Sequence, residues 1–168
     1  MNIKDVWMRV FEWIILKLVF KKVTYLINLY RPPNTSITNT KKLLKFVTDF
    51  SCKEIILTGS FNVPGINWQE NKCDSTSLSR TLIEWVDKNQ LEQHVVEPTR
   101  EDKVLDLVLS HPFKIIYDLV TIEQFSSSDH KAIKFNIRTS FQKQNKSVNL
   151  IRQITSKGFI LNKVRSII

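Results

Sequence analysis

The stretch "ILTGSFNVPGINW", residues 56–68, carries the strongest structural signal in this sequence. Its first residues are apolar, which favours a strand buried in the middle of a sheet and ending at Gly59. A polar, turn-rich loop containing Ser60 and Asn62 then leads to Trp68. Binding and catalytic groups of α/β proteins commonly lie on loops at the ends of such strands. The stretch therefore raises the question of whether Ser60 has a chemical role or stands in the place of another residue.

Hydrophobic periodicity around this stretch predicts the other elements. The expected strands are 13–18, 23–30, 54–59, 105–110, 115–122 and 131–137. One helix is expected around Leu43 and Val47 with Thr38 or Asn39 as its N-cap, and a second is expected to begin at an N-cap at Ser77. Helices between strands, followed by strands in succession, indicate an α/β sandwich with mixed sheets. The polar region from 139 onward predicts a solvated linker, followed by a short amphipathic helix near 151–167.

Composition narrows the class of partner. The chain has 168 residues, a formal net charge of +9 and a pI of about 9.6, a balance that favours polyanions such as nucleic acid or an acidic membrane face. Charged residues interrupt the apolar region near the amino terminus, which predicts no membrane span. The only cysteines, Cys52 and Cys73, form neither a zinc motif nor a disulfide framework, so an intracellular setting is expected. A nuclear location has no compact basic signal to support it.

Polar residues recur where the predicted strands end. Tyr30 and Asn34 follow one strand, Asp106 lies in "LDLVLS", and "SSSDH" (126–130) precedes the last strand. Each has a purely structural alternative, such as a turn, a cap or a hydrogen bond at the edge of the core. Together with Ser60 and Asn62, however, they can converge on one rim of the sandwich and form a substrate site.

The motifs "YRPPN", "ILTG-FN-PGINW", "PTR" before "LDLVLS", and "SSSDHKAI" resemble the endonuclease/exonuclease/phosphatase family. Within it they are most similar to the apurinic-endonuclease-like nuclease domain of non-LTR retrotransposons, over about residues 12–137. The resemblance implies a sandwich of two mixed β-sheets flanked by helices, here missing its first strands. It also implies a partial nuclease domain over 1–138, with 139–168 leading towards a reverse transcriptase that is absent.

The resemblance implies a role for each matching residue. His130 would contact the scissile phosphate, Asp106 would orient His130, and Asp129 would lie near Mg²⁺. Asn62 would hold the phosphate or the attacking water. The residues expected to line the substrate are Tyr30, Asn34, Arg31, Trp68 and Ser128. DNA is the expected partner, with no membrane and no stable protein partner.

Two departures from the family pattern weaken the expected activity. Ser60 stands where the family has an aspartate, and a serine hydroxyl cannot accept a proton near neutral pH. The strand with the family's Mg²⁺-binding glutamate has no match here; Glu12 aligns elsewhere and is expected at the surface, so the Mg²⁺ site is expected to be incomplete. The resulting hypothesis is a weakened Mg²⁺-dependent DNA endonuclease. The alternatives are a non-catalytic nucleic-acid-binding remnant and a reading frame without a selected role.

Overall fold

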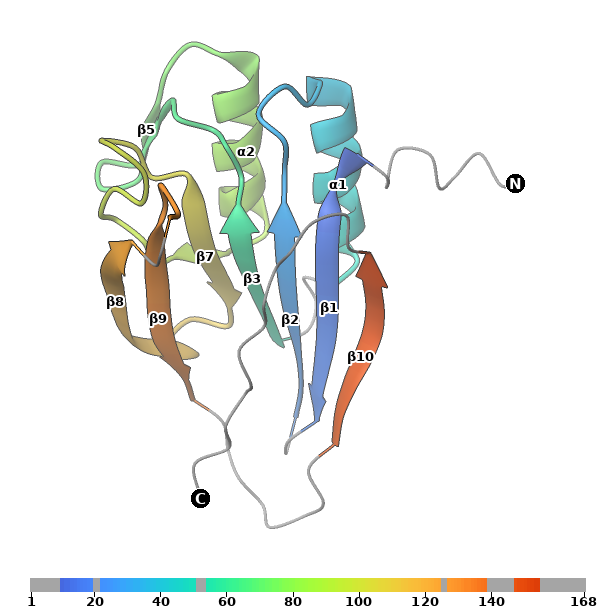
Figure 1. Cartoon of the computed structure of the whole chain (residues 1–168). Coiled ribbons are helices and arrows are strands. Elements are labelled where there is room, and N and C mark those ends of the chain that lie inside the picture. Colours follow the sequence, from blue (N-terminus) through green and yellow to red (C-terminus); the bar gives the residue numbers. More distant parts are fainter. Residues whose placement is uncertain (1–9, 20–21, 51–53, 125–126, 139–146, 155–168) are drawn as a thin grey trace.

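The computed structural model describes residues 10–19, 22–50, 54–124, 127–138 and 147–154. A six-stranded sheet forms its centre, in the order β10-β1-β2-β3-β7-β6 (Figure 1). Its strands are β1 (Glu12–Val19), β2 (Val23–Tyr30), β3 (Glu54–Ser60), β6 (Glu92–Gln93), β7 (Asp106–His111) and β10 (Ser147–Ile154). The two-stranded sheets pair β4 (Ile66–Asn67) with β5 (Lys72–Cys73), and β8 (Ile116–Gln124) with β9 (Lys131–Ile137). The mixed-sheet α/β architecture predicted from the sequence is confirmed.

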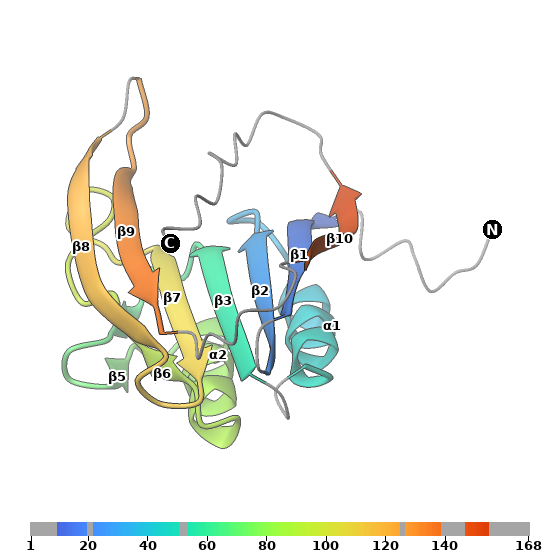
Figure 2. The same cartoon turned by 90° about the horizontal axis from the view of Figure 1, so that it is seen from below.

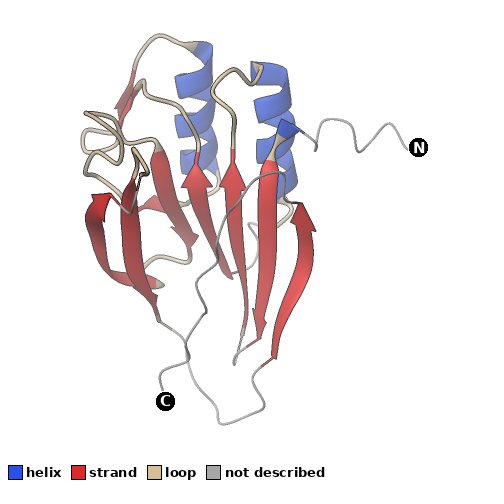
Figure 3. Cartoon of the chain, viewed as in Figure 1, coloured by secondary structure: helices blue, strands red, loops and turns tan. Residues whose placement is uncertain are grey.

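Two helices, α1 (Ile37–Thr48) and α2 (Ser77–Lys88), cover one face of the large sheet (Figures 2 and 3). Their apolar sides contribute Leu43, Val47 and Leu82 to the main core, which also contains Leu57 and Leu107 of the sheet. Alternate strand residues point to the other face. There a second cluster joins the large sheet to the β8–β9 hairpin. No described helix is long and apolar enough to cross a membrane.

The observed cap of each helix lies one to three residues before the predicted ones. Ser36 caps α1, with its hydroxyl accepting from the Asn39 amide, and Thr76 caps α2 in the same way through Ser79. The predicted caps Thr38, Asn39 and Ser77 are wrong, since all three lie inside the helices. Several neighbouring residues in each segment have side chains able to cap, and only the backbone conformation at the helix start selects one of them.

The region expected to be a linker contains a strand. Residues 147–154 form β10, which pairs antiparallel with β1 and gives that strand a second neighbour. The helix predicted near 151–167 is therefore wrong over 151–154, and its remainder lies outside the described residues. The physical reason is tertiary: β1 would otherwise present an unpaired edge, and such an edge accepts a strand whose own sequence signal is weak.

The sheet register brings polar strand ends into one row. Tyr30 of β2 lies opposite Ser60 of β3, and Ser60 lies opposite Asp106 of β7. Glu12 of β1 extends the row beyond Tyr30. Register partners share a face, and this face is the one opposite the helices, because the alternate residues Leu29 and Leu107 belong to the helix-side core. The sheet itself therefore builds the rim that the sequence predicts.

Candidate functional site

A histidine–aspartate pair lies at one end of this row. His130 Nδ1 is 2.7 Å from Asp106 Oδ2, a distance at which the ring nitrogen donates to the carboxylate. The two side chains are 27% and 17% exposed, so solvent and a ligand can reach the imidazole. With Nδ1 engaged by Asp106, Nε2 is the ring nitrogen that remains for a hydrogen bond to another group. The structure thus brings together the two residues that the resemblance pairs.

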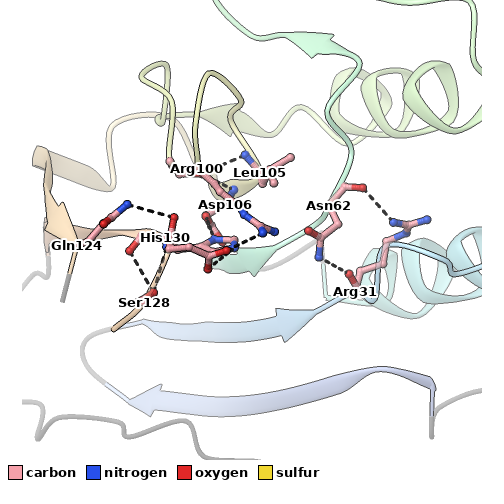
Figure 4. Close-up of polar contacts among 10 residues, drawn as sticks. Arg31, Asn62, Arg100, Leu105, Asp106, Gln124, Ser128 and His130 are labelled. Atoms are coloured by element: carbon pink, nitrogen blue, oxygen red, sulfur yellow. Dashed lines mark hydrogen bonds and ion pairs between the residues drawn. The ribbon is translucent and has the colours of Figure 1, made fainter. Parts of the chain in front are cut away.

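Local hydrogen bonds position both members of this pair (Figure 4). The Ser128 hydroxyl accepts from the His130 amide at 3.1 Å and lies 3.2 Å from the His130 carbonyl. Ser128 is exposed and shapes the turn before β9. On the other side, the fully buried Thr99 hydroxyl accepts from the amides of Leu105 and Asp106, both at 3.1 Å. Ser128 therefore has a structural contact with His130 in addition to the substrate role expected for it.

Ser60 is 9% exposed, and its hydroxyl is a buried oxygen with no hydrogen-bond partner among the described residues. A buried hydroxyl with no partner is unfavourable, because it gives up hydrogen bonds to water without replacement. Ser60 lies in register with Asp106, and so it borders the histidine–aspartate pair. Ser60 therefore neighbours polar groups, but none of the described groups forms a hydrogen bond with its hydroxyl.

Arg31 lies inside the protein, with 0% exposure. Its guanidinium donates to the Thr40 hydroxyl at 3.0 Å and to the carbonyls of Phe61, Asn62 and Thr35 at 3.1, 3.3 and 2.9 Å. Burial lowers the pKa of the Arg31 guanidinium from its ordinary value. The sequence predicts a substrate contact for Arg31, but all these donors bind the chain itself, which leaves the guanidinium no route to a phosphate at the surface.

Asn62 is held by the same network. Its side-chain amide donates to the Arg31 carbonyl at 2.7 Å, and its backbone is left-handed with φ 50. Each of Arg31 and Asn62 thus donates a hydrogen bond to the carbonyl of the other, which joins the loop after β2 to the loop after β3. Figure 4 shows the Asn62 side chain turned towards Arg31 rather than towards His130. In this structure the Asn62 amide group has a structural partner, and its proposed contact with phosphate or water would use the remaining oxygen or a rearranged side chain.

The other expected substrate residues make no hydrogen bond to the pair in the described part of the chain. Asn34 is exposed in the loop after β2, and Tyr30 is half-buried at the strand end. Trp68 packs against the main core, and its indole nitrogen is buried with no partner among the described residues. It also lines an open hollow of about 420 Å³ between the 64–69 and 96–104 loops. Packing against the core is the simpler account of Trp68.

Asp129, the expected metal ligand, has Arg100 and His130 as neighbours instead. Its Oδ2 lies 2.6 Å from Arg100 Nη2, and its Oδ1 lies 3.9 Å from His130 Nε2. Asp106 is likewise engaged by His130. Within the described ranges, no group of three or more His, Cys, Asp or Glu side chains could hold a metal. Since Mg²⁺ prefers carboxylates that are free to coordinate it, these residues as arranged do not fit a Mg²⁺ site.

Two contributors to the site have no specific role in the sequence prediction. Thr99 and Arg100 belong to "PTR", a motif of the family resemblance, and the sequence favours Arg100 only as one of several basic residues suited to phosphate contacts. Thr99 ties the loop to the start of β7, and Arg100 reaches the acid beside His130. The signal available in the sequence was a threonine and an arginine a few residues before a strand that begins with an acid.

Comparisons with known proteins agree with this fold. A family model described as endonuclease-reverse transcriptase matches residues 24–134. Among solved structures, the endonuclease domain of TRAS1, a telomere-specific non-LTR retrotransposon, matches with a TM-score of 0.63 and 19% sequence identity. The match covers 76% of this chain and 62% of that domain, so this chain spans less than two thirds of its length. No match was found among curated proteins.

Proposed function

Since the chain belongs to the endonuclease–reverse transcriptase family, we propose that it derives from a retrotransposon nuclease domain and is a weakened DNA endonuclease. The observation that carries the proposal is the His130–Asp106 pair, 2.7 Å apart, at the end of the row formed by Tyr30, Ser60 and Asp106. A nuclease needs donors for the non-bridging phosphate oxygens and a base that readies the attacking water. The chain retains the donors and lacks the base.

His130 and Asp106 have complementary parts in this proposal. Asp106 fixes the orientation of the imidazole, because its carboxylate oxygen lies at hydrogen-bond distance from Nδ1. Nε2 then donates to a phosphate oxygen on which charge develops. Arg31 and Asn62 stiffen the adjoining loop, so that the rim keeps its shape when the substrate binds.

Ser60 explains why the activity is weak. General-base groups typically contribute a factor of about 10²–10⁴, which corresponds to roughly 3–5 kcal/mol of activation free energy. A serine in this position can donate or accept a hydrogen bond but cannot take up the proton of water. We propose Mg²⁺ dependence only for residual activity of the chain or for activity regained by Ser60→Asp. The acidic side chains of the described residues, as arranged in the structure, do not form a metal site.

A second candidate function is non-catalytic binding of DNA. Two observations favour it. Arg100 occupies the Asp129 carboxylate in an ion pair, and the neutral Ser60 hydroxyl supplies no acid to the rim. The net charge of +9 also favours contacts with phosphates that weaken as salt rises. Absence of DNA affinity at low salt would remove this candidate.

One comparison tests the two functions. Supercoiled plasmid is incubated in Mg²⁺ or in EDTA with the chain, with Ser60→Asp, with Ser60→Asn as the uncharged isostere, and with the double variant Ser60→Asp/His130→Ala. The nuclease proposal predicts Mg²⁺-dependent nicking by Ser60→Asp well above that of the chain and of Ser60→Asn, and loss of nicking in the double variant. No nicking by any protein, with DNA binding retained, would support the binding remnant.

A further inference from the structure

Arg100 lies on a firmly anchored turn beside the histidine–aspartate pair. The turn closes through Arg100 and Lys103, whose backbones exchange hydrogen bonds of 3.1 and 2.9 Å. The Lys131 amide donates to the Thr99 carbonyl at 2.8 Å, which joins the turn to the start of β9 directly after His130. The Thr99 hydroxyl joins it to Asp106. Backbone contacts on both sides therefore set the position of Arg100 relative to both members of the pair.

The guanidinium of Arg100 is only partly engaged. Asp129 is its one side-chain partner among the described residues, at 2.6 Å, and the two side chains are 40% and 64% exposed. An arginine has five N–H donors, so most of them remain available to a ligand. The other oxygen of the same carboxylate lies 3.9 Å from His130 Nε2. One exposed carboxylate thus lies between two groups that can donate to a phosphate (Figure 4 labels Arg100 and His130).

We propose that Arg100 and His130 form a phosphate-binding site that needs no metal ion, in which Arg100 supplies the positive charge and Asp129 holds it in place when DNA is absent. The inference rests on the proposed derivation from a DNA nuclease. It goes further by assigning a residue that the family resemblance does not assign, and by separating DNA binding from Mg²⁺.

An exposed ion pair suits this role. Such a pair contributes little to stability, because water solvates both charges in the alternative state. Arg100 can therefore exchange Asp129 for a phosphodiester at small cost. The planar guanidinium can then bind two phosphate oxygens through two charge-assisted hydrogen bonds. In the ion pair with Asp129, a single carboxylate oxygen occupies only part of this donor capacity. Asp129 itself repels the incoming phosphate, so its charge limits the affinity.

The test is a binding titration that needs no catalysis. A short fluorescein-labelled DNA duplex is titrated with the full chain at low salt, in EDTA and in Mg²⁺, and fluorescence anisotropy is recorded. The variants are Arg100→Gln and Asp129→Asn. Arg80→Gln is the matched control, because Arg80 is an exposed arginine on α2, on the opposite face of the sheet.

The proposal predicts equal or tighter binding in EDTA, since Mg²⁺ only screens the phosphates. Arg100→Gln should weaken binding by roughly tenfold and reduce the slope of log K against log salt by about 0.9. Arg80→Gln should change affinity less than about twofold, and Asp129→Asn should tighten binding. Binding that requires Mg²⁺, an unchanged affinity in Arg100→Gln, or weaker binding by Asp129→Asn in Mg²⁺ would overturn the inference while leaving DNA binding intact. Loss of DNA binding by every protein, the unchanged chain included, would overturn it together with the function on which it rests.

Discussion

Replacing Ser60 with aspartate, the residue that the family resemblance implies at this position, should destabilise the protein in the absence of metal. The new carboxylate would lie opposite Asp106 in the antiparallel β3–β7 register, on a position that is 9% exposed. Like charges placed directly opposite on neighbouring strands repel each other. Because Asp106 is already paired with His130, the imidazole offsets part of this repulsion.

The magnitude follows from Coulomb's law. Side chains of register partners are about 5 Å apart, and two unit charges at this distance repel by about 3 kcal/mol with an effective dielectric constant of 20. Allowing for His130, we expect Ser60→Asp to lower the free energy of unfolding by about 2 kcal/mol relative to Ser60→Asn, which has the same shape without the charge.

Urea unfolding, followed by circular dichroism, measures this difference at pH 7 in EDTA and then in Mg²⁺. If the two carboxylates create a metal site, Mg²⁺ should return about 2.7 kcal/mol to Ser60→Asp at a concentration of 100 Kd and leave Ser60→Asn unchanged. Equal stability of the two variants in EDTA would refute the reasoning, since it would mean that residue 60 and Asp106 do not face each other.

Three further outcomes test the framework around the site. Gly59→Ala should lower the free energy of unfolding by roughly 3 kcal/mol or more, because φ is +127 and the new Cβ would lie 1.8 Å from the Leu29 carbonyl oxygen; a urea midpoint unchanged from that of the parent would contradict this. Arg31→Met should cost about 3 kcal/mol or more, since it leaves buried oxygens without donors, and should shift the NMR signals of the Asn62 side-chain amide. Arg31→Lys should recover part of the stability and part of the NMR shift. An unchanged Asn62 signal in Arg31→Met would show that Arg31 does not position the Asn62 side chain. Burial lowers the pKa of His94 below its ordinary value, with partial opposition from Glu92; the folded state therefore binds fewer protons, so stability should be complete above about pH 6.5 and fall as pH drops through that value. His94→Gln should remove this part of the pH dependence, and an unchanged pH profile would rule out His94 as its source.

The strands could be predicted from the sequence because their signals are local. "EIILTG" and "LDLVLS" are short apolar runs bounded by turn residues, and Pro32 and Pro33 end β2 unambiguously. β10 could not be predicted in this way, because it depends on pairing with the edge of β1. The pairing of Asp106 with His130 was expected from the resemblance, and the structure shows that Thr99 joins the two segments, since it accepts from the amides of both Asp106 and Lys131.

Arginine positions were the least predictable part of the site. A sequence does not reveal that Arg31 is fully buried, because arginine is usually exposed. The carbonyls that accept hydrogen bonds from its guanidinium also come from two separate loops. For the same reason it does not reveal that Arg100 reaches Asp129 across a turn and a strand start. Both side chains find their partners through tertiary packing, whereas hydrophobic periodicity reports only on local structure.

The central proposal is that Tyr30, Ser60 and Asp106 of the sheet, together with His130 in the turn before β9, form one surface that faces DNA. Its most direct test is an NMR titration of the isotopically labelled chain with a short DNA duplex at low salt. If these residues face DNA, the largest shifts of backbone amides should occur at them and at Arg100. Shifts confined to α1 and α2, on the opposite face of the sheet, would contradict it.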